Sequence, residues 1–321
     1  MAKVNATGSP GVFESKSIGD LEERVLQTLH LADRRGYGLT LSNISKMLFH
    51  GAMDEDAVSC ELDSMQSVSH SFGIYCLKGS ESLLPVTREK LLCNEMIAKK
   101  YEALAKDFVS EYASFSPFIR FIAIAGSMAS GGFSEDDDID FNIIVEKGCK
   151  YTVYLSGILL SIKYSIRHRK KPLARKSATP FLSKLICINV IWEDWESLPF
   201  WRQDKYMAYE LLNQKPVFGL RFYRTVIQSN QWLETYFPQI YDTHEIPARI
   251  TPVPTSLAGR LMRLFYSNRT ASSFGEMVCR KVSYVLWRIV QFSRRNNPDA
   301  LARVRLVNEM QKPYSLFGDR V

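Results

Sequence analysis

The segment FIRFIAIAGSMASGGFSEDDDIDFNIIV, residues 118–145, contains two apolar runs separated by a small-residue turn and an acidic loop. Residues 119–125 are apolar and rich in β-branched side chains, which is typical of a strand covered on both faces. The following GSMASGG, residues 126–132, supplies small residues whose backbone can approach a phosphate closely. We therefore expect a buried strand, a turn able to cradle phosphate, and a second strand.

The second predicted strand, residues 138–145, carries acidic residues on one face. Because side chains alternate along a strand, Asp138, Asp140 and Asn142 point one way and apolar residues the other. Two neighbouring carboxylates repel unless a cation lies between them. Mg²⁺ or Mn²⁺ suits this position, since carboxylates, water and phosphate oxygens fill its coordination sphere during phosphoryl or nucleotidyl transfer. The alternative is a Gly-Ser hairpin turn followed by a solvated acidic loop.

The order of these features resembles a known signature. A hydrophobic strand, Gly-Ser, ten intervening residues and Asp-hydrophobic-Asp are similar to the motif of the polymerase-beta-type nucleotidyltransferase superfamily. The segments RVLQTLHLADRRGYGLTLSNISKML, KLICINVIW and KYMAYELLNQKPVFG resemble bacterial and archaeal nucleotidyltransferase-domain proteins in which a winged-helix-like segment precedes the transferase domain. The resemblance extends to about Gly219.

The resemblance implies an α+β fold with a nucleotidyltransferase core, in which helices flank a mixed β-sheet. The expected divisions are a disordered lead-in, a winged-helix-like module, the nucleotidyltransferase domain and a C-terminal helical region, at residues 1–17, 18–90, 91–245 and 246–321. The implied reaction transfers a nucleoside monophosphate from an NTP, with ATP favoured, and releases pyrophosphate. The acceptor, whether a small metabolite, a protein or RNA, is not defined by the sequence.

The resemblance also implies roles for individual residues. Asp138 and Asp140 would hold the metal as catalytic residues, and Gly126 and Ser127 would bind the triphosphate. Many members of the superfamily carry a third carboxylate on a later strand, where this chain offers Asn189.

Asn189 bears on activity, because an amide brings no charge to a second metal and cannot act as a base. We expect it to orient ligands or the acceptor, while Glu193 or Asp194 could replace the acid if the register differs. The alternative function is a catalytically weak or inactive nucleotidyltransferase-fold protein that acts as a nucleotide-responsive or nucleic-acid-binding regulator.

The strongest basic run is SIRHRKKPLARKS, residues 165–177. This run lies between the predicted strand that carries the acid pair and the predicted strand that carries Asn189. We therefore expect its cations, Lys170 and Lys171 among them, to contact the triphosphate or an anionic acceptor. The alternative is a solvated basic loop. The formal net charge of +7 is compatible with an anionic substrate.

The N-terminal region predicts three helices and a hairpin. The helices are expected within residues 19–35, after Thr40 or Ser42, and over residues 54–65; GIYCL and LLPV are expected as strands. The third helix is rich in Asp and Glu, which repel DNA phosphates. A structural or protein-contact role is therefore favoured over DNA binding.

Composition narrows the class of protein. No apolar run approaches the ~20 residues of a membrane span, so no membrane partner is expected. The six cysteines are scattered singly among the 321 residues, which favours reduced thiols in a cytoplasmic protein. The basic tail from Leu257 is expected to be helical, and either to pack over the nucleotide cleft or to offer a basic face to a partner. Oligomeric state is not defined by the sequence.

Overall fold

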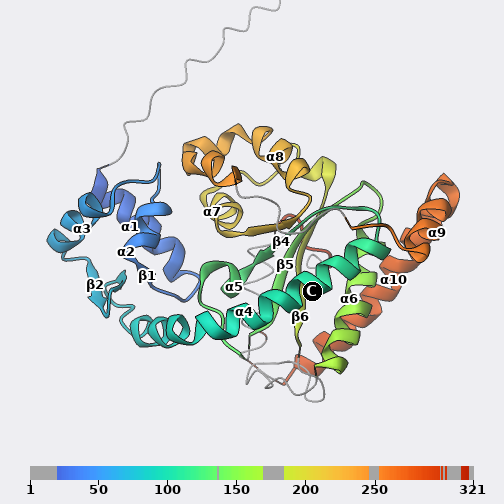
Figure 1. Ribbon diagram of the computed structural model, residues 1–321, viewed down its shortest axis with the longest axis horizontal. Helices are drawn as coiled ribbons and strands as arrows, with labels where there is room; N and C mark the ends of the chain where they lie inside the picture. The colour runs from blue at the N-terminus through green and yellow to red at the C-terminus, as the bar shows by residue number, and fades with distance from the viewer. Residues whose placement is uncertain are drawn as a thin grey trace, which may run out of the picture.

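The computed structural model describes residues 20–135, 137–168, 184–245, 253–296, 298, 301 and 312–317. Over these residues the fold is α+β, with a three-stranded sheet near the N-terminus and a four-stranded sheet at the centre (Figure 1). The predicted lead-in, residues 1–17, lies outside the described residues.

The N-terminal module contains three helices and a small antiparallel sheet. Its elements are α1 (Leu21–Asp33), β1 (Leu39–Thr40), α2 (Leu41–Lys46), α3 (Glu55–Ser64), β2 (Val68–Ser71) and β3 (Ile74–Leu77), with strand order β1-β3-β2. Thr40 caps α2, as predicted, because its side chain accepts a hydrogen bond from the Asn43 amide at 3.3 Å. Val25, Leu29, Ile44 and Val58 form a core between the helices.

The predicted strand LLPV is wrong. Leu83 begins the long helix α4 (Leu83–Phe115), and Pro85 is tolerated in its first turn because the amide there has no partner within the helix. The hairpin pairs β3 with β2 instead. Its turn residues Phe72 and Gly73 both have positive φ, 56° and 72°, as a two-residue hairpin turn of the favoured twist requires.

The central sheet has the strand order β6-β5-β4-β7. Its strands are β4 (Ile119–Ala125), β5 (Ile139–Val145), β6 (Ile186–Glu193) and β7 (Lys215–Phe218). β4 is antiparallel to both β5 and β7, whereas β5 and β6 are parallel, so the sheet is mixed. The parallel pair begins together, since Ile139 lies opposite Ile186. Side chains at the start of β6 are therefore brought next to those at the start of β5.

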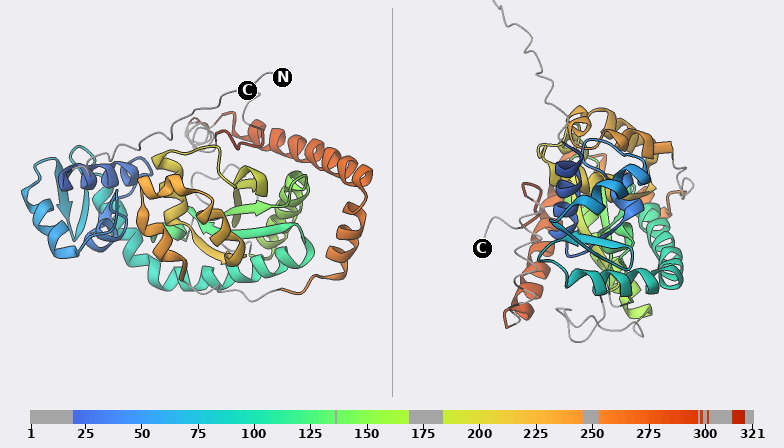
Figure 2. Two further views of the ribbon diagram at one scale, coloured as in Figure 1. Left: turned by 90° about the horizontal axis from the view of Figure 1, so that it is seen from above. Right: turned by 90° about the vertical axis from the view of Figure 1, so that its left-hand side faces the viewer.

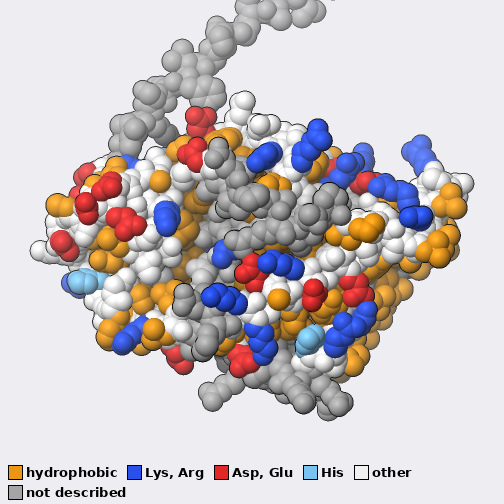
Figure 3. Space-filling model, viewed as in Figure 1, with side chains coloured by type: hydrophobic (Ala, Val, Ile, Leu, Met, Phe, Trp, Pro, Cys, Tyr) orange, Lys and Arg blue, Asp and Glu red, His pale blue; other side chains and the backbone are white. Residues whose placement is uncertain are grey.

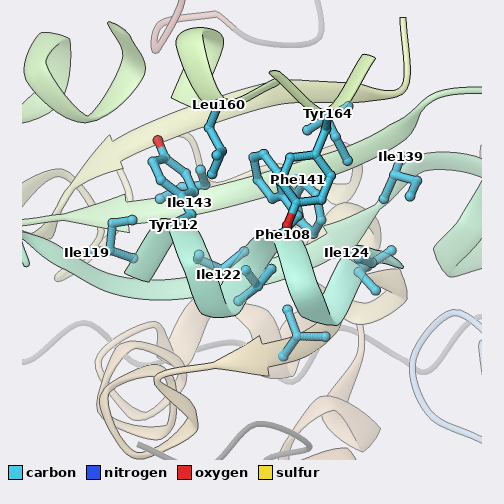
Figure 4. Packing of buried hydrophobic residues seen from close by; sticks show 14 of the residues in the cluster. Phe108, Tyr112, Ile119, Ile122, Ile124, Ile139, Phe141, Ile143, Leu160 and Tyr164 are labelled. Atoms are coloured by element: carbon cyan, nitrogen blue, oxygen red, sulfur yellow. The ribbon is translucent and has the colours of Figure 1, made fainter. Parts of the chain in front are cut away.

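One face of this sheet is covered by α4 and α6 (Lys150–Arg167). Figure 4 shows Phe108 and Tyr112 of α4 packing between β4, β5 and α6. The rings of Phe108 and Phe141 stack at 5.3 Å, and Leu160 and Tyr164 complete the layer from α6. This face is a continuous apolar core, and α4 crosses the boundary predicted between residues 90 and 91 to reach it.

The opposite face is covered by α7 (Lys205–Asn213), α8 (Leu220–Gln228) and the short helices η2 (Gln231–Thr235) and η3 (Pro238–Glu245). A further short helix, η1 (Asp194–Glu196), directly follows β6. Phe121 of β4 stacks on Tyr223 of α8 with ring centroids 4.2 Å apart. The N-terminal module adjoins this side, as Figure 2 shows, with Leu31 and Phe49 packed into the same core.

The C-terminal helices α9 (Leu257–Tyr266) and α10 (Arg269–Arg294) pack on α4 and α6. Arg263 pairs with Glu146 at 2.7 Å, and Glu276 accepts hydrogen bonds from the amides of Tyr151 and Thr152 at the start of α6. α9 and α10 therefore lie on the outer side of α4 and α6, while Tyr314, further along the tail, packs against Trp192 and Trp201. Within the described part of the chain, every helix is too short or too polar to cross a membrane.

Candidate functional site

The carboxylates of Asp138 and Asp140 lie together at the start of β5. Asp138 directly precedes the strand, Asp140 is its second residue, and both side chains are partly exposed. Ligand atoms of these two residues and of Cys187 all lie within 4.8 Å of one another. The structure thus brings together the acid pair that the sequence predicts and adds a thiol from β6.

Gly126 lies directly beneath this pair. It has φ +61°, and a Cβ atom at this position would overlap the Asp140 carboxylate. Glycine satisfies both constraints, because it alone adopts positive φ without penalty and leaves room for the carboxylate.

The short helix α5 (Gly126–Ser130) begins at this glycine, and Ser127 lies in its first turn. The Ser127 carbonyl accepts hydrogen bonds from the Gly132 amide at 2.9 Å and from the Ser130 hydroxyl at 3.2 Å. Gly131, with φ 85°, ends the helix in the left-handed conformation. The small-residue segment therefore forms a compact turn of helix against the acid pair, where the sequence predicts only a turn.

Lys184, just before β6, forms an ion pair with Asp138, with Nζ 2.5 Å from Oδ2. Burial alone lowers the pKa of Lys184, but the carboxylates of Asp138 and Asp140 outweigh it and raise that pKa. Burial raises the pKa of the Cys187 thiol, against the opposing effect of Lys184 and with a further increase from the two carboxylates. At neutral pH the site therefore holds a cationic lysine and a neutral thiol beside the acid pair.

The residue on β6 opposite Asp140 is Cys187, whereas Asn189 lies further along the strand. A register irregularity after Ile188 turns Asn189 toward Asn142, and its Nδ2 donates a hydrogen bond to the Asn142 Oδ1 at 2.9 Å. Glu193 pairs with Val145 at the other end of β5. A different register therefore does not bring Glu193 to the acid pair, which corrects that alternative.

Asn142 belongs to a buried polar network, which we call the amide network, formed by Asn142, Asn189, Gln214, Glu210 and Arg35. Asn142 is fully buried, and its Nδ2 donates to the Glu210 Oε1 at 2.9 Å and to the Gln214 Oε1 at 3.0 Å. Glu210 pairs in turn with Arg35 of the N-terminal module at 2.6 Å. Burial lowers the pKa of Arg35, but Glu210 outweighs this effect and raises it, so the guanidinium remains cationic. The amide network thus ties the N-terminal module to the central sheet.

A cavity of about 80 Å³ adjoins the amide network. It lies between α1, β6 and α7, and its polar lining comes from Arg34, Arg35, Asn189, Arg202 and Glu210. Two of these arginines already have acidic partners, because Arg35 pairs with Glu210 and Arg202 with Asp204. Most of the charge in its lining is therefore compensated within the protein.

Two further predicted cations, Lys170 and Lys171, lie outside the described residues. Lys215 at the start of β7 reaches α5, where its Nζ donates a hydrogen bond to the Met128 carbonyl at 3.4 Å. This contact places one lysine beside the Gly-Ser turn.

Sequence reasoning missed Lys184, Cys187, Glu210 and Arg35. The first two could have been found from topology, because parallel pairing of two strands of similar length aligns their starts. The pair of Arg35 and Glu210 joins residues 175 positions apart and has no local signal.

Comparison of the chain with protein-family models, with curated proteins and with solved structures finds no match.

Proposed function

We propose that this protein is a Mg²⁺-dependent nucleotidyltransferase of the polymerase-beta-type superfamily, which transfers a nucleoside monophosphate from an NTP to an acceptor and releases pyrophosphate. The observation that carries the proposal is the proximity of the Asp138 and Asp140 carboxylates, with Asp140 packed against Gly126 at the start of α5. The three helices and hairpin of the N-terminal module support a winged-helix-like assignment for that part.

The donor set fits a hard divalent cation. Asp138 and Asp140 offer carboxylate oxygens, which Mg²⁺ and Mn²⁺ prefer, whereas the neutral thiol of Cys187 is a soft donor and a poor ligand for either. Lys184 compensates one of the two carboxylate charges, so the pair retains negative charge for a metal. When bound, the ion would neutralise charge on the phosphates during transfer.

Other residues would hold the nucleotide. Gly126 and Ser127 form the first turn of α5, beside Asp140, and their backbone would bind phosphate oxygens. Lys184 and Lys215 approach this position from β6 and β7 and would add positive charge. Asn189 keeps its proposed role in orienting a ligand only through the cavity that it lines, because its amide donates to Asn142.

A second candidate function is a catalytically weak or inactive regulator that responds to nucleotide. It is favoured by Cys187, which occupies the β6 position opposite Asp140 and cannot supply the charge of a third carboxylate. Both functions predict metal-dependent NTP binding, so only turnover separates them.

The test is incubation with each of the four radiolabelled NTPs and Mg²⁺ or Mn²⁺, with and without cell extract, following label transfer and pyrophosphate. The variants are Asp138→Ala/Asp140→Ala and, as a matched control, Glu135→Ala, which removes an exposed acid from the same loop. Transfer by the wild type and the control, but not by the double variant, is expected. Binding without turnover would favour the regulator, and absence of NTP binding would contradict both functions.

A further inference from the structure

The helices α9 and α10 carry an unusually apolar outer surface. Of the large hydrophobic side chains that are exposed in the described part of the chain, more than half lie on these two helices. Figure 3 shows hydrophobic side chains along the right-hand edge, where Figure 1 places both helices. We call this surface the outer apolar face; it consists of Leu257, Leu261, Leu264, Phe265, Phe274, Met277, Val278, Val282, Tyr284, Val285, Ile289 and Phe292.

On α10 these residues form a continuous stripe. Phe274, Val278, Val285, Ile289 and Phe292 recur at intervals of three, four or seven residues, which places them on one side of the helix. The other side carries the buried Ser283 and Glu276, whose carboxylate accepts hydrogen bonds from the start of α6. The stripe therefore lies on the side of α10 that points away from these contacts.

The segment that forms these two helices carries a high net positive charge. Residues 257–296 contain eight Lys and Arg residues and a single acid, Glu276, so their net charge is +7, which equals that of the whole chain. Lys281 and Arg288 lie at the border of the stripe, and both are exposed. Long basic side chains at such a border can cover apolar surface while their charged ends reach anions.

We propose that the outer apolar face of α9 and α10 docks on an anionic lipid surface, with the two helices lying in the membrane interface. Apolar area combined with flanking positive charge and almost no acid is the combination that such surfaces bind. The expectation of no membrane partner concerned membrane-spanning segments, and helices that lie in the interface need no apolar run of spanning length. This inference is independent of the proposed nucleotidyl transfer.

The positive charge of these helices disfavours a second copy of the chain as the partner of the outer apolar face, and its apolar side chains disfavour nucleic acid. A two-fold dimer would place the same face of each copy against the other, so positive surfaces would meet without acidic partners on these helices. Nucleic acid would satisfy the charge but would leave large aliphatic and aromatic side chains such as Val285 and Ile289 without apolar contact.

The test is flotation of the purified protein with vesicles of phosphatidylcholine alone and of phosphatidylcholine mixed with phosphatidylglycerol. Binding to the mixed vesicles, weakened by salt, is expected. Val285→Glu/Ile289→Glu should abolish it, and Lys281→Gln/Arg288→Gln should weaken it by about fivefold for each charge removed. Leu92→Glu, which changes an exposed leucine of α4, is the matched control and should bind like the wild type.

Three results would overturn the proposal. They are no binding to the mixed vesicles, equal binding to both vesicle types, and a stable dimer in sedimentation velocity that Val285→Glu/Ile289→Glu dissociates. Thermal melting establishes that each variant is folded. If the glutamate variant does not fold, the Lys281→Gln/Arg288→Gln variant decides the outcome, because its substitutions are at exposed positions.

Discussion

Asp140 and Asn142 lie two residues apart on the same face of β5, yet their surroundings differ. Asp140 is partly exposed and lies beside the Asp138 carboxylate, Lys184 and the start of α5. Asn142 is fully buried, and its amide oxygen and nitrogen are both engaged by side chains of the amide network.

The difference separates polar residues that hold the fold from those available to a ligand. A buried group whose hydrogen bonds are all satisfied by the protein specifies one packing arrangement and has little capacity left for a ligand. Two like charges that remain partly accessible have capacity for a cation. We therefore propose that the acid pair carries the chemistry and that the amide network holds the fold, although Asp140 and Asn142 occupy one strand.

The largest expected effect comes from Asp140→Asn. The variant removes one proposed metal ligand without changing side-chain volume, so pyrophosphate release should fall by about a thousandfold. Thermal stability should be unchanged or slightly higher, because the repulsion between the two carboxylates is removed. Wild-type turnover in this variant would place the metal elsewhere.

Next is Arg35→Leu, which leaves the Glu210 carboxylate without its ion-pair partner in a largely buried position. We expect a loss of about 3 kcal/mol in the free energy of unfolding, measured by urea denaturation. Arg34→Leu is the matched control, because this exposed neighbour stacks on Tyr206 and should cost about 0.5 kcal/mol. Equal losses would show that the amide network does not stabilise the protein.

A smaller loss is expected for Asn142→Ala, which removes the hydrogen bonds between the Asn142 amide and Glu210, Gln214 and Asn189. The cost should be about 2 kcal/mol in unfolding free energy. NTP affinity of the folded variant should stay close to that of the wild type. A selective loss of NTP binding, with stability intact, would show that Asn142 contributes to ligand binding rather than to the fold.

The smallest effect is expected for Cys187→Ser. Because the neutral thiol is not a ligand for a hard cation, turnover with Mg²⁺ should change by less than about threefold. Parallel assays with Mg²⁺, Mn²⁺ and Cd²⁺ would check this result. If the wild type prefers Cd²⁺ and the variant does not, Cys187 is a metal ligand.

Local features of this fold could be predicted from the sequence. The apolar run of β4, the alternation of β5 and the Thr40 cap of α2 all depend on neighbouring residues, and the structure contains each of them. The acid pair follows from the same alternation, because Asp138 and Asp140 share a face whatever packs around them.

Features that depend on distant contacts could not be predicted. The irregularity after Ile188 decides that Val190, and not Asn189, pairs with Asn142, and nothing in the strand sequence specifies it. The start of α4 at Leu83 was missed because an apolar run with proline also fits a strand. The ion pair of Arg35 and Glu210 forms only after two modules pack together.

The most direct test of the central claim is a titration with Mn²⁺ in the presence of an NTP, followed by electron paramagnetic resonance, on the wild type, Asp140→Asn and Asn189→Ala. We predict that Asp140→Asn weakens Mn²⁺ binding by at least about tenfold, whereas Asn189→Ala, at the end of the amide network, binds as the wild type does. Equal binding by Asp140→Asn and the wild type, or an equal loss in Asn189→Ala, would contradict the division between acid pair and amide network.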